Sequence, residues 1–333
     1  MPAIAGQTAM IYVREVALPG VPARTTSPDR VVLFVHGAGT PGEVAFDTPF
    51  EDYSWMAYLA KAGYDVFAMD MTGYGRSTRP LAMNDPCNFG PEAQKPFVKA
   101  PCPPSYPNNM TTLASDWNDI SAVVDYLLER RRVKHVALVG WSLGGPRAGG
   151  YTAGNQDKVS KLMLLSPAYN RDGMGEAVAA AAAGPAMSAQ TKEDFDANWS
   201  RQIGCPDQFV PAASKAVWAA MLESDPQGMT WGPGIRRAPL VTWRGGWSKS
   251  VAAMVKTPTL LFAPAHDKQA LPAGVGRLHD DLGAAKKVLV DLGCTSHNAL
   301  WEKNHLVLFK ASLEWLQKGT VEGKDSGTVR LGY

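Results

Sequence analysis

Short, continuously apolar runs alternate with amphipathic segments along most of this sequence. The runs are rich in β-branched residues and contain few polar positions, as expected of parallel strands that are covered on both faces. The runs at residues 30–37, 64–70, 135–140, 161–167, 257–264 and 286–292 are the predicted strands. Their alternation with helical patterns predicts a doubly wound, mostly parallel α/β sheet.

Two segments between or after these runs have a clear helical period. Residues 116–132 place apolar side chains at intervals of three and four, which gives one apolar face. The C-terminal segment repeats this pattern and then meets Gly319, a typical residue at a helix end. The apolar positions are Ile120, Val123, Val124, Leu127 and Leu128 in the first segment and Leu306, Phe309, Leu313 and Leu316 in the second.

Two regions interrupt the alternation. Residues 80–110 are dense in Pro and Asn and predict a long loop, and such loops are usually functional or mobile. Residues 168–250 are too long for an ordinary connection, and the Ala-rich stretch 176–184 predicts a helix. We therefore expect a core of residues 1–167 and 251–333, with residues 168–250 as a helical cap at the strand ends, where open α/β sheets bind ligands. The last dozen residues are the one candidate for disorder.

The stretch "VALVGWSLGG" carries the strongest chemical signal. It places a Gly-x-Ser-x-Gly pattern directly after a predicted strand and before small residues that would let a helix approach the sheet. A serine at such a sharp strand-to-helix turn is exposed above the sheet, where it can attack a substrate. The pattern predicts Ser142 as a nucleophile. A helix N-cap is the structural alternative for this serine.

A serine nucleophile needs a base and a group that orients the base. His297 follows the last predicted core strand and is the predicted base, whereas His305 begins a helix and is expected to pack or face solvent. Asp267 follows the strand before it and is the predicted acid. Asp172 also follows a strand and remains an alternative, whereas Asp70 fits a turn.

Other residues near these positions complete a candidate site. The residue after the nucleophile, Leu143, and the glycine turn "HGAG", through Ala38, would supply two backbone N–H donors for a developing oxyanion. Trp141 and Trp301 lie beside the predicted nucleophile and base and are candidate substrate contacts. No phosphate-binding glycine loop is present.

Five motifs together resemble the α/β-hydrolase superfamily, specifically a capped serine hydrolase of the esterase/lipase type. They are "FVHGAG", "DMTGYGRS", "GWSLGG", "FAPAHD" and "TSHNALWE", in the order and at the spacing of that superfamily. The resemblance covers residues 10–165 and 250–318. Two features depart from the pattern. The acid turn reads "APAHD", where many relatives have a glycine before the acid, and the loop at 80–110 is longer than usual. The resemblance implies nucleophile Ser142, acid Asp267, base His297 and oxyanion donors Ala38 and Leu143.

Charge and composition narrow the partner. With 33 basic and 31 acidic residues and no long run of either sign, the chain has no footprint for nucleic acid. The first residues lack the pattern of a signal peptide, which favours the cytoplasm, and no apolar stretch is long enough to span a membrane. The mechanism needs no metal or organic cofactor. The oligomeric state has no signal in the sequence.

The four cysteines have no metal-type spacing. Cys87 and Cys102 bracket part of the Pro-rich loop, so a disulfide between them would tie the loop down. Such a bridge would indicate an oxidising compartment and export, whereas free thiols would fit the cytoplasm.

The fold alone does not fix the reaction. The leading hypothesis is hydrolysis of carboxylic esters of apolar or aromatic small molecules through an acyl-enzyme. Cleavage of a C–C bond, a lactone or an amide with the same residues is the alternative, and a non-catalytic binding protein of the same fold is the hypothesis from another class.

Overall fold

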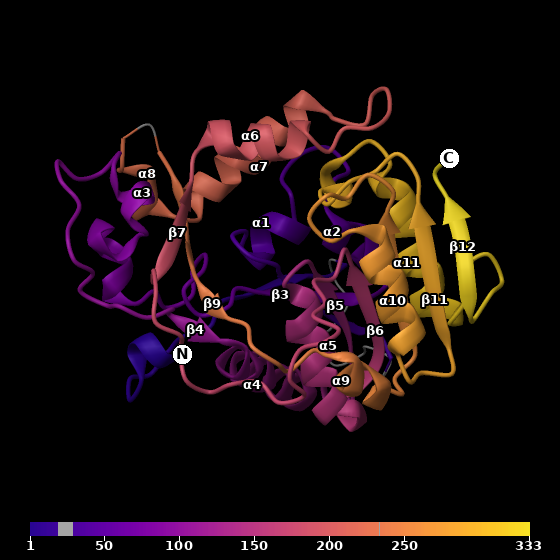
Figure 1. Cartoon of the computed structure of the whole chain (residues 1–333). Coiled ribbons are helices and arrows are strands. Elements are labelled where there is room, and N and C mark those ends of the chain that lie inside the picture. Colours follow the sequence, from indigo (N-terminus) through magenta and orange to yellow (C-terminus); the bar gives the residue numbers. More distant parts are fainter. Residues whose placement is uncertain (19–28, 233) are drawn as a thin grey trace.

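A sheet of eight strands runs through the centre of the protein, with the order β1-β3-β2-β5-β6-β10-β11-β12 (Figure 1). The computed structural model describes residues 1–18, 29–232 and 234–333. Strand β1 runs antiparallel to β3, and all other neighbours in this sheet are parallel. The strands are β1 (Val13–Val16), β2 (Val31–Val35), β3 (Asp65–Met69), β5 (Val136–Trp141), β6 (Val159–Leu165), β10 (Thr259–Pro264), β11 (Lys287–Leu292) and β12 (Gly327–Leu331).

Helices cover both faces of the sheet, which explains why central strands such as β2, β5 and β10 are continuously buried. In β2, Val32 and Phe34 belong to one hydrophobic cluster, whereas Val31, Leu33 and Val35 belong to the other. This alternation follows from the period of two residues in a strand. Helices α2 (Trp55–Lys61) and α11 (His305–Lys318) pack on the first face, and α4 (Leu113–Arg131), α5 (Gly144–Gly154), α9 (Lys249–Met254) and α10 (Pro272–Asp281) pack on the second.

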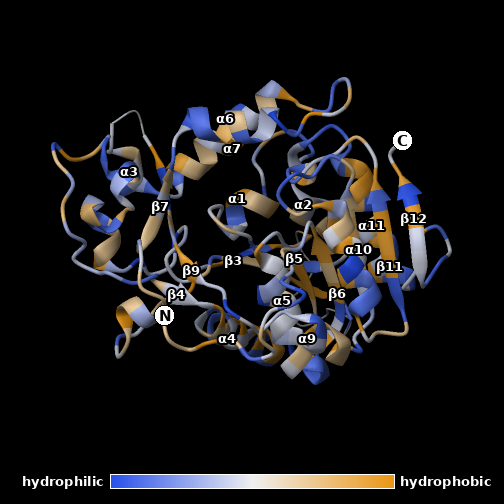
Figure 2. Cartoon of the chain, in the orientation of Figure 1, coloured by the Kyte–Doolittle hydropathy of each residue, from blue (hydrophilic) through white to orange (hydrophobic). Residues whose placement is uncertain are grey.

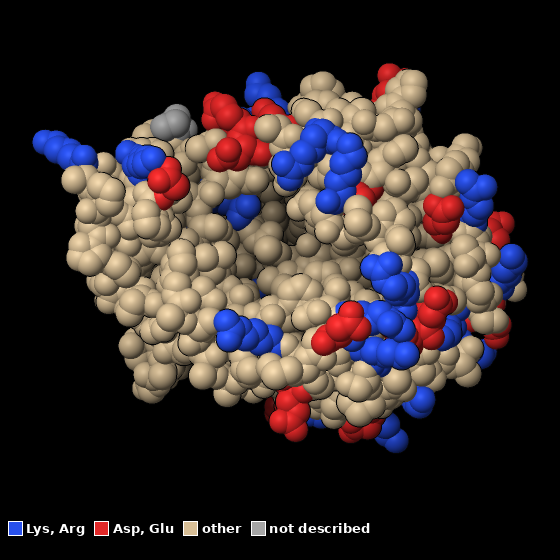
Figure 3. Space-filling view, in the orientation of Figure 1, with Lys and Arg blue, Asp and Glu red and all other residues tan. Residues whose placement is uncertain are grey.

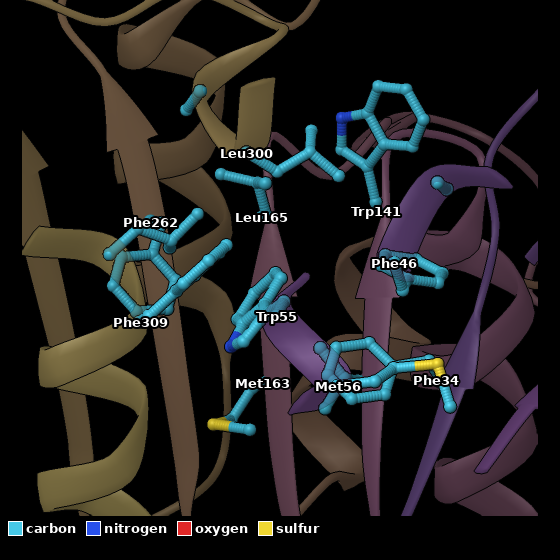
Figure 4. Close-up of a cluster of buried hydrophobic side chains, with 14 of the residues drawn as sticks. Phe34, Phe46, Trp55, Met56, Trp141, Met163, Leu165, Phe262, Leu300 and Phe309 are labelled. Carbon is cyan, nitrogen blue, oxygen red and sulfur yellow. The ribbon is translucent and has the colours of Figure 1, made fainter. Parts of the chain in front are cut away.

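Aromatic side chains fill the first of these two clusters (Figure 4). The Trp55 and Phe309 rings stack with centroids 5.4 Å apart, so α2 and α11 contact each other over the sheet. Phe34 lies 4.6 Å from Phe46, measured between ring centroids. Figure 2 shows the same distribution at the level of the chain, with apolar residues concentrated in the central strands.

The fold class predicted from the sequence is confirmed, and all six predicted strands are present. The predicted helices correspond to α4 and α11, and Gly319 ends α11 in the left-handed conformation, with φ of 68°. Strands β1 and β12 were not predicted. The expectation that the last dozen residues could be disordered is wrong, because β12 pairs with β11 at the sheet edge.

The chain between β6 and β10 contains both helices and short strands. Among its described residues before α9, the helices are α6 (Lys192–Ser200), α7 (Pro211–Glu223) and α8 (Pro226–Met229), and the strands are β7 (Met187–Gln190), β8 (Arg236–Pro239) and β9 (Val241–Thr242). Strands β7 and β8 form an antiparallel pair, whereas β9 pairs with β4 (Thr111–Thr112). These strands were not predicted. The other short helices are α1 (Gly42–Phe46) and α3 (Pro91–Gln94).

The predicted helix in the Ala-rich stretch 176–184 is wrong. The described backbone there is irregular, and it donates and accepts hydrogen bonds with segments distant in sequence. Asn109 N donates to the Ala182 carbonyl at 2.8 Å, and Ala182 N donates to Thr242 Oγ1 at 2.7 Å. A short isolated helix is only marginally stable in water, so tertiary hydrogen bonds override the helix propensity of alanine here.

Two disulfides are present. Cys87–Cys102 closes the loop at 80–110, as considered from the sequence, and Cys205–Cys294 links the segment between α6 and α7 to the loop after β11. The second pairing was not predicted. Within the described ranges, no helix is long and apolar enough to cross a membrane. The predicted core range 1–167 includes residues 19–28, and the predicted insertion 168–250 includes residue 233, which lie outside the described residues.

Two glycines of α5 provide a matched test of how closely this helix packs. A Cβ at Gly149 would overlap the buried Trp247 ring, whereas a Cβ at Gly154 would meet open space. We predict that Gly149→Ala lowers the free energy of unfolding by about 1–3 kcal/mol through overpacking. Gly154→Ala should raise it by up to about 1 kcal/mol through helix propensity. Urea denaturation of both variants measures these changes, and equal effects would contradict the close approach of Trp247.

Candidate active site

Ser142 occupies a strained turn between β5 and α5. Its φ is 58°, in the left-handed region, which costs a non-glycine residue about 1–3 kcal/mol. The turn lies against the glycine turn after β2, and a Cβ at Gly37 would be 2.8 Å from the Ser142 Cβ. Ser142 is partly exposed, although the strand before it is buried. The sharp turn therefore presents the hydroxyl at the end of the sheet.

The two other predicted triad residues are hydrogen-bonded to each other. His297 Nδ1 lies 2.9 Å from Asp267 Oδ2, and both side chains are buried. The other carboxylate oxygen, Asp267 Oδ1, accepts hydrogen bonds from the backbone N–H groups of Gln269 and Ala270, at 2.8 and 2.9 Å. A proton on Nδ1 that points to the carboxylate leaves Nε2 as the free acceptor on the imidazole.

Ser142 and His297 line one pocket, with a volume of about 170 Å³. This volume is below the range of about 300–1,000 Å³ that is typical for drug-sized ligands, so it suits a small molecule. Figure 3 shows a hollow in this face of the molecule that lies among mostly uncharged residues, and atoms of a Lys or Arg side chain are visible inside it. The pocket is lined by Ala38, Thr40, Trp141, Ser142, Gln190, Phe195, Asn198, Met221, Arg236, Gln269, His297, Asn298 and Trp301.

The sequence alternatives for acid and base lie elsewhere. Asp172 is exposed, and the imidazole of His297 is paired with Asp267 instead. His305 is buried against Tyr53, with ring centroids 3.8 Å apart, and contacts Asp52. His305 is therefore a packing residue, as expected.

Asp70 has the structural place that the sequence suggested. Its carboxylate accepts backbone hydrogen bonds from Gly42 at 2.8 Å and from Arg76 at 3.0 Å, so it joins the start of α1 to the turn after β3. Burial raises the pKa of Asp70 to about 6, against the opposing effect of these hydrogen bonds.

The two predicted oxyanion donors flank Ser142. Ala38 is exposed at the tip of the turn after β2, and Leu143 is the N-cap residue of α5. Among the described residues, neither backbone N–H donates a hydrogen bond. Both are therefore without a hydrogen-bond acceptor in the described part of the chain, as donors to an oxyanion would be.

Arg147 supports this turn from below, a role that the sequence analysis missed. Its guanidinium is fully buried, donates to the carbonyls of His36 and Gly37 at 3.0 Å each, and pairs with Asp116 at 2.7 Å. His36 Nε2 accepts from Met71 N at 3.0 Å. Burial, together with the charge of Arg147, holds the pKa of His36 well below its usual value, so this imidazole is neutral.

Trp141 and Trp301 both line the pocket, and each also supports the site. Trp141 Nε1 donates to the carbonyl of His297 at 2.9 Å, and Trp301 Nε1 donates to the carbonyl of Ala45 at 3.2 Å. The two indole rings lie edge to face, with centroids 5.1 Å apart. Their polar atoms are used inside the protein, so only ring surface is left to face a ligand.

Glu302 connects the loop of His297 to the segment between β6 and β10. Its carboxylate accepts hydrogen bonds from Trp199 Nε1 at 2.8 Å, Gln208 Nε2 at 3.0 Å and Ser296 Oγ at 2.6 Å. The Cys205–Cys294 disulfide joins the same two segments. The His297 loop is thus fixed on both sides of His297, by the disulfide at Cys294 and by the hydrogen bonds of Glu302.

In the part of the chain that the structure describes, no cluster of three or more His, Cys, Asp or Glu residues could hold a metal ion.

Comparison with known proteins agrees with this architecture. A family model described as alpha/beta hydrolase fold matches residues 30–304. No curated protein matches the sequence. Among solved structures, a monoacylglycerol lipase from Paleococcus ferrophilus has a TM-score of 0.54 and 17% identity, over 93% of this chain and 100% of that one.

Two further solved structures show the same fold. An esterase from Exiguobacterium antarcticum has a TM-score of 0.54 and 16% identity, over 93% of this chain and 96% of its own. A serine hydrolase from the polyaromatic-hydrocarbon-degrading bacterium Cycloclasticus zankles has a TM-score of 0.55 and 13% identity, over 92% of this chain and 94% of its own.

The raised pKa of Asp70 predicts a pH-dependent contribution to stability. Because the folded-state pKa is about 6 and the ordinary value is 3.8, this contribution is fully present below about pH 4 and is lost as the pH rises through 6. Between about pH 7.5 and 4.5, the free energy of unfolding of the wild type should rise relative to Asp70→Asn by roughly 2 kcal/mol. Urea denaturation at both pH values measures this shift. Asp172→Asn, which removes an exposed carboxylate, is the control, and a pH-independent difference for Asp70→Asn would contradict the prediction.

Proposed function

Because this chain belongs to the α/β-hydrolase fold family, we propose that it is a serine hydrolase that cleaves carboxylic esters of small molecules. The observation that carries this proposal is the convergence of Ser142, in its left-handed turn, and His297, paired with Asp267, on one pocket. The lipase and the esterase with the same fold support the ester class.

In the proposed mechanism, His297 Nε2 accepts the proton of Ser142 Oγ as this oxygen attacks the ester carbonyl. Asp267 holds the imidazole in the required tautomer and stabilises the imidazolium. The N–H groups of Ala38 and Leu143 stabilise the negative oxygen of the tetrahedral intermediate. His297 then donates its proton to the leaving alcohol and next activates a water, which releases the acid from Ser142.

We also propose that residues 168–250 act as a cap on this site. Phe195, Asn198, Met221 and Arg236 all come from this segment and line the pocket with Ser142. Phe195 and Trp199 of α6 join the hydrophobic cluster of the sheet. The cap therefore closes the pocket with its own side chains, so the cap sets the shape that a substrate must fit.

Substitution of the triad tests the reaction. We predict that Ser142→Ala and His297→Ala each lower kcat for 4-nitrophenyl esters by about 10⁴-fold or more, and that Asp267→Asn lowers it by about 10⁴-fold through loss of the correct tautomer. Asp172→Asn is the control and should retain wild-type activity. Hydrolysis of a series from acetate to dodecanoate is the measurement, together with labelling of Ser142 by a fluorophosphonate.

Labelling without ester turnover would move the reaction to a C–C bond, a lactone or an amide. A folded protein that neither labels nor turns over any ester would indicate a binding protein instead.

The two disulfides support the proposal that the protein works in an oxidising compartment.

The two disulfides also allow a test that distinguishes an effect on stability from an effect on substrate binding. Replacement of Cys205 and Cys294 by serine should cost about 2–5 kcal/mol of unfolding free energy and raise KM, because it frees the cap from the His297 loop. The matched Cys87→Ser/Cys102→Ser variant should lose stability with KM unchanged. Thermal unfolding and steady-state kinetics of both double variants measure this, and an unchanged KM in both would contradict the coupling.

A further inference from the structure

The pocket of the proposed active site contains an arginine, Arg236, that pairs with no carboxylate of the described residues. Arg236 lines the pocket together with Ser142 and His297, and no Asp or Glu is among the lining residues. In the described part of the chain, Arg236 forms no salt bridge with a carboxylate. Among these residues, its side-chain hydrogen bonds go to the neutral amide of Gln190, whose Oε1 accepts from Arg236 Nε at 3.0 Å and from Nη2 at 2.8 Å.

The next residue, Arg237, is a buried arginine with a structural role, and it is paired with a carboxylate. Arg237 points to the opposite side of strand β8, as the alternation of a strand requires. Its guanidinium pairs with Asp225 at 2.7 Å and is fully buried. Asp225 also lies 3.7 Å from Arg79, so its charge is already shared. Arg236 receives no such partner.

The guanidinium of Arg236 remains charged at neutral pH. Burial lowers the pKa of Arg236 to about 10, against the opposing effects of Tyr74 and of Asp225, and this value is still well above 7. Two of its five N–H groups donate to Gln190, and the others donate to no described residue, so they can bind a ligand. A charge without a counter-ion in a partly buried site destabilises the folded protein, so this arrangement suggests that a ligand supplies the opposite charge.

The arginine is held close to the reacting groups. Gln190 of β7 and Arg236 of β8 are directly opposite each other in the antiparallel register, so their side chains share one face of this ribbon. A Cβ at Gly39 would overlap the Arg236 guanidinium, whereas a Cβ at Gly37 would be 2.8 Å from Ser142 Cβ. Two residues span at most about 7 Å, so the cation and the nucleophile contact the two ends of one short turn.

We propose that Arg236, oriented by Gln190, binds a carboxylate of the substrate, so that the enzyme prefers small esters that carry an anionic group a few bonds from the scissile carbonyl. Guanidinium and carboxylate groups match in planar, bidentate geometry, which gives both affinity and orientation. This proposal rests on the proposed esterase function. It revises the expectation of an apolar or aromatic substrate, although the rings of Trp141, Phe195 and Trp301 still provide an apolar wall.

Matched ester pairs test the proposal. The substrates are the mono-4-nitrophenyl esters of succinate, glutarate and adipate, each compared with the neutral 4-nitrophenyl alkanoate of equal length. 3-Carboxyphenyl acetate against phenyl acetate places the charge on the leaving group instead. We expect kcat/KM of the wild type to favour at least one anionic ester over its neutral partner by about tenfold or more.

The variant Arg236→Met removes the charge and keeps much of the side-chain volume. We expect it to lower kcat/KM for the preferred anionic ester by about 30–100-fold and for the neutral partner by less than about threefold, mainly through KM. Arg236→Lys should recover part of the preference. Arg244→Met, which removes an exposed charge from the same segment, is the control and should leave both substrates unchanged. Thermal unfolding checks that each variant is folded.

Several outcomes would overturn the proposal while the esterase function stands. One is a wild type without preference for any anionic ester. Another is an equal loss for anionic and neutral esters in Arg236→Met, which would place the charge in stabilisation of the reaction itself. If no ester is hydrolysed and Ser142 does not label, the esterase function fails. Calorimetric titration with glutarate then tests the anion site separately. Binding to Ser142→Ala that is abolished by adding Arg236→Met would support the anion site, and no binding to Ser142→Ala would overturn it.

Discussion

The close approach of two tight turns is the constraint on which the site depends. Ser142 can face the pocket only if the chain reverses sharply between β5 and α5, and that reversal requires a positive φ at the serine. The reversal also brings Ser142 against the backbone of the turn after β2. At Gly37 in that turn there is no room for a side chain, because a Cβ would be 2.8 Å from the Ser142 Cβ. The strain at Ser142 persists because the buried strand β5 and the buried helix α5 fix the two ends of the turn.

The same constraint explains why a buried ion pair lies beneath the pocket. A turn that exposes its N–H groups to the pocket directs carbonyl groups into the protein, where they need donors. Arg147 supplies them to His36 and Gly37, and Asp116 neutralises its charge. The turn after β2, which carries the proposed oxyanion donor Ala38, is thus held by hydrogen bonds from α5, the helix that begins two residues after Ser142.

The sequence predicted the parts of this molecule that local patterns determine. Continuous apolar runs identified the buried strands, and residues that follow parallel strands meet at one sheet edge, so Asp267 and His297 could be paired before the structure was known. Other parts depend on contacts that no local pattern records. The Ala-rich stretch 176–184 looked helical, but its backbone hydrogen bonds go to other segments. Arg236 lies on a four-residue strand that is too short for a recognisable pattern, and the Cys205–Cys294 disulfide spans a sequence separation of 89.

Three arginines around the site show how this fold distributes charge. Arg147 and Arg237 are fully buried, and each has a carboxylate within 2.7 Å. Arg236 is partly exposed and lines the pocket, and within the described ranges its hydrogen-bond partner is the neutral amide of Gln190. Removal of a guanidinium from water is unfavourable in all three cases, and the fold compensates that cost internally for the two that support structure. In the proposed site, an anion that enters the pocket compensates this cost for Arg236. Because β8 of the proposed cap carries this arginine, the insertion would add selectivity to the proposed chemistry at the end of the sheet.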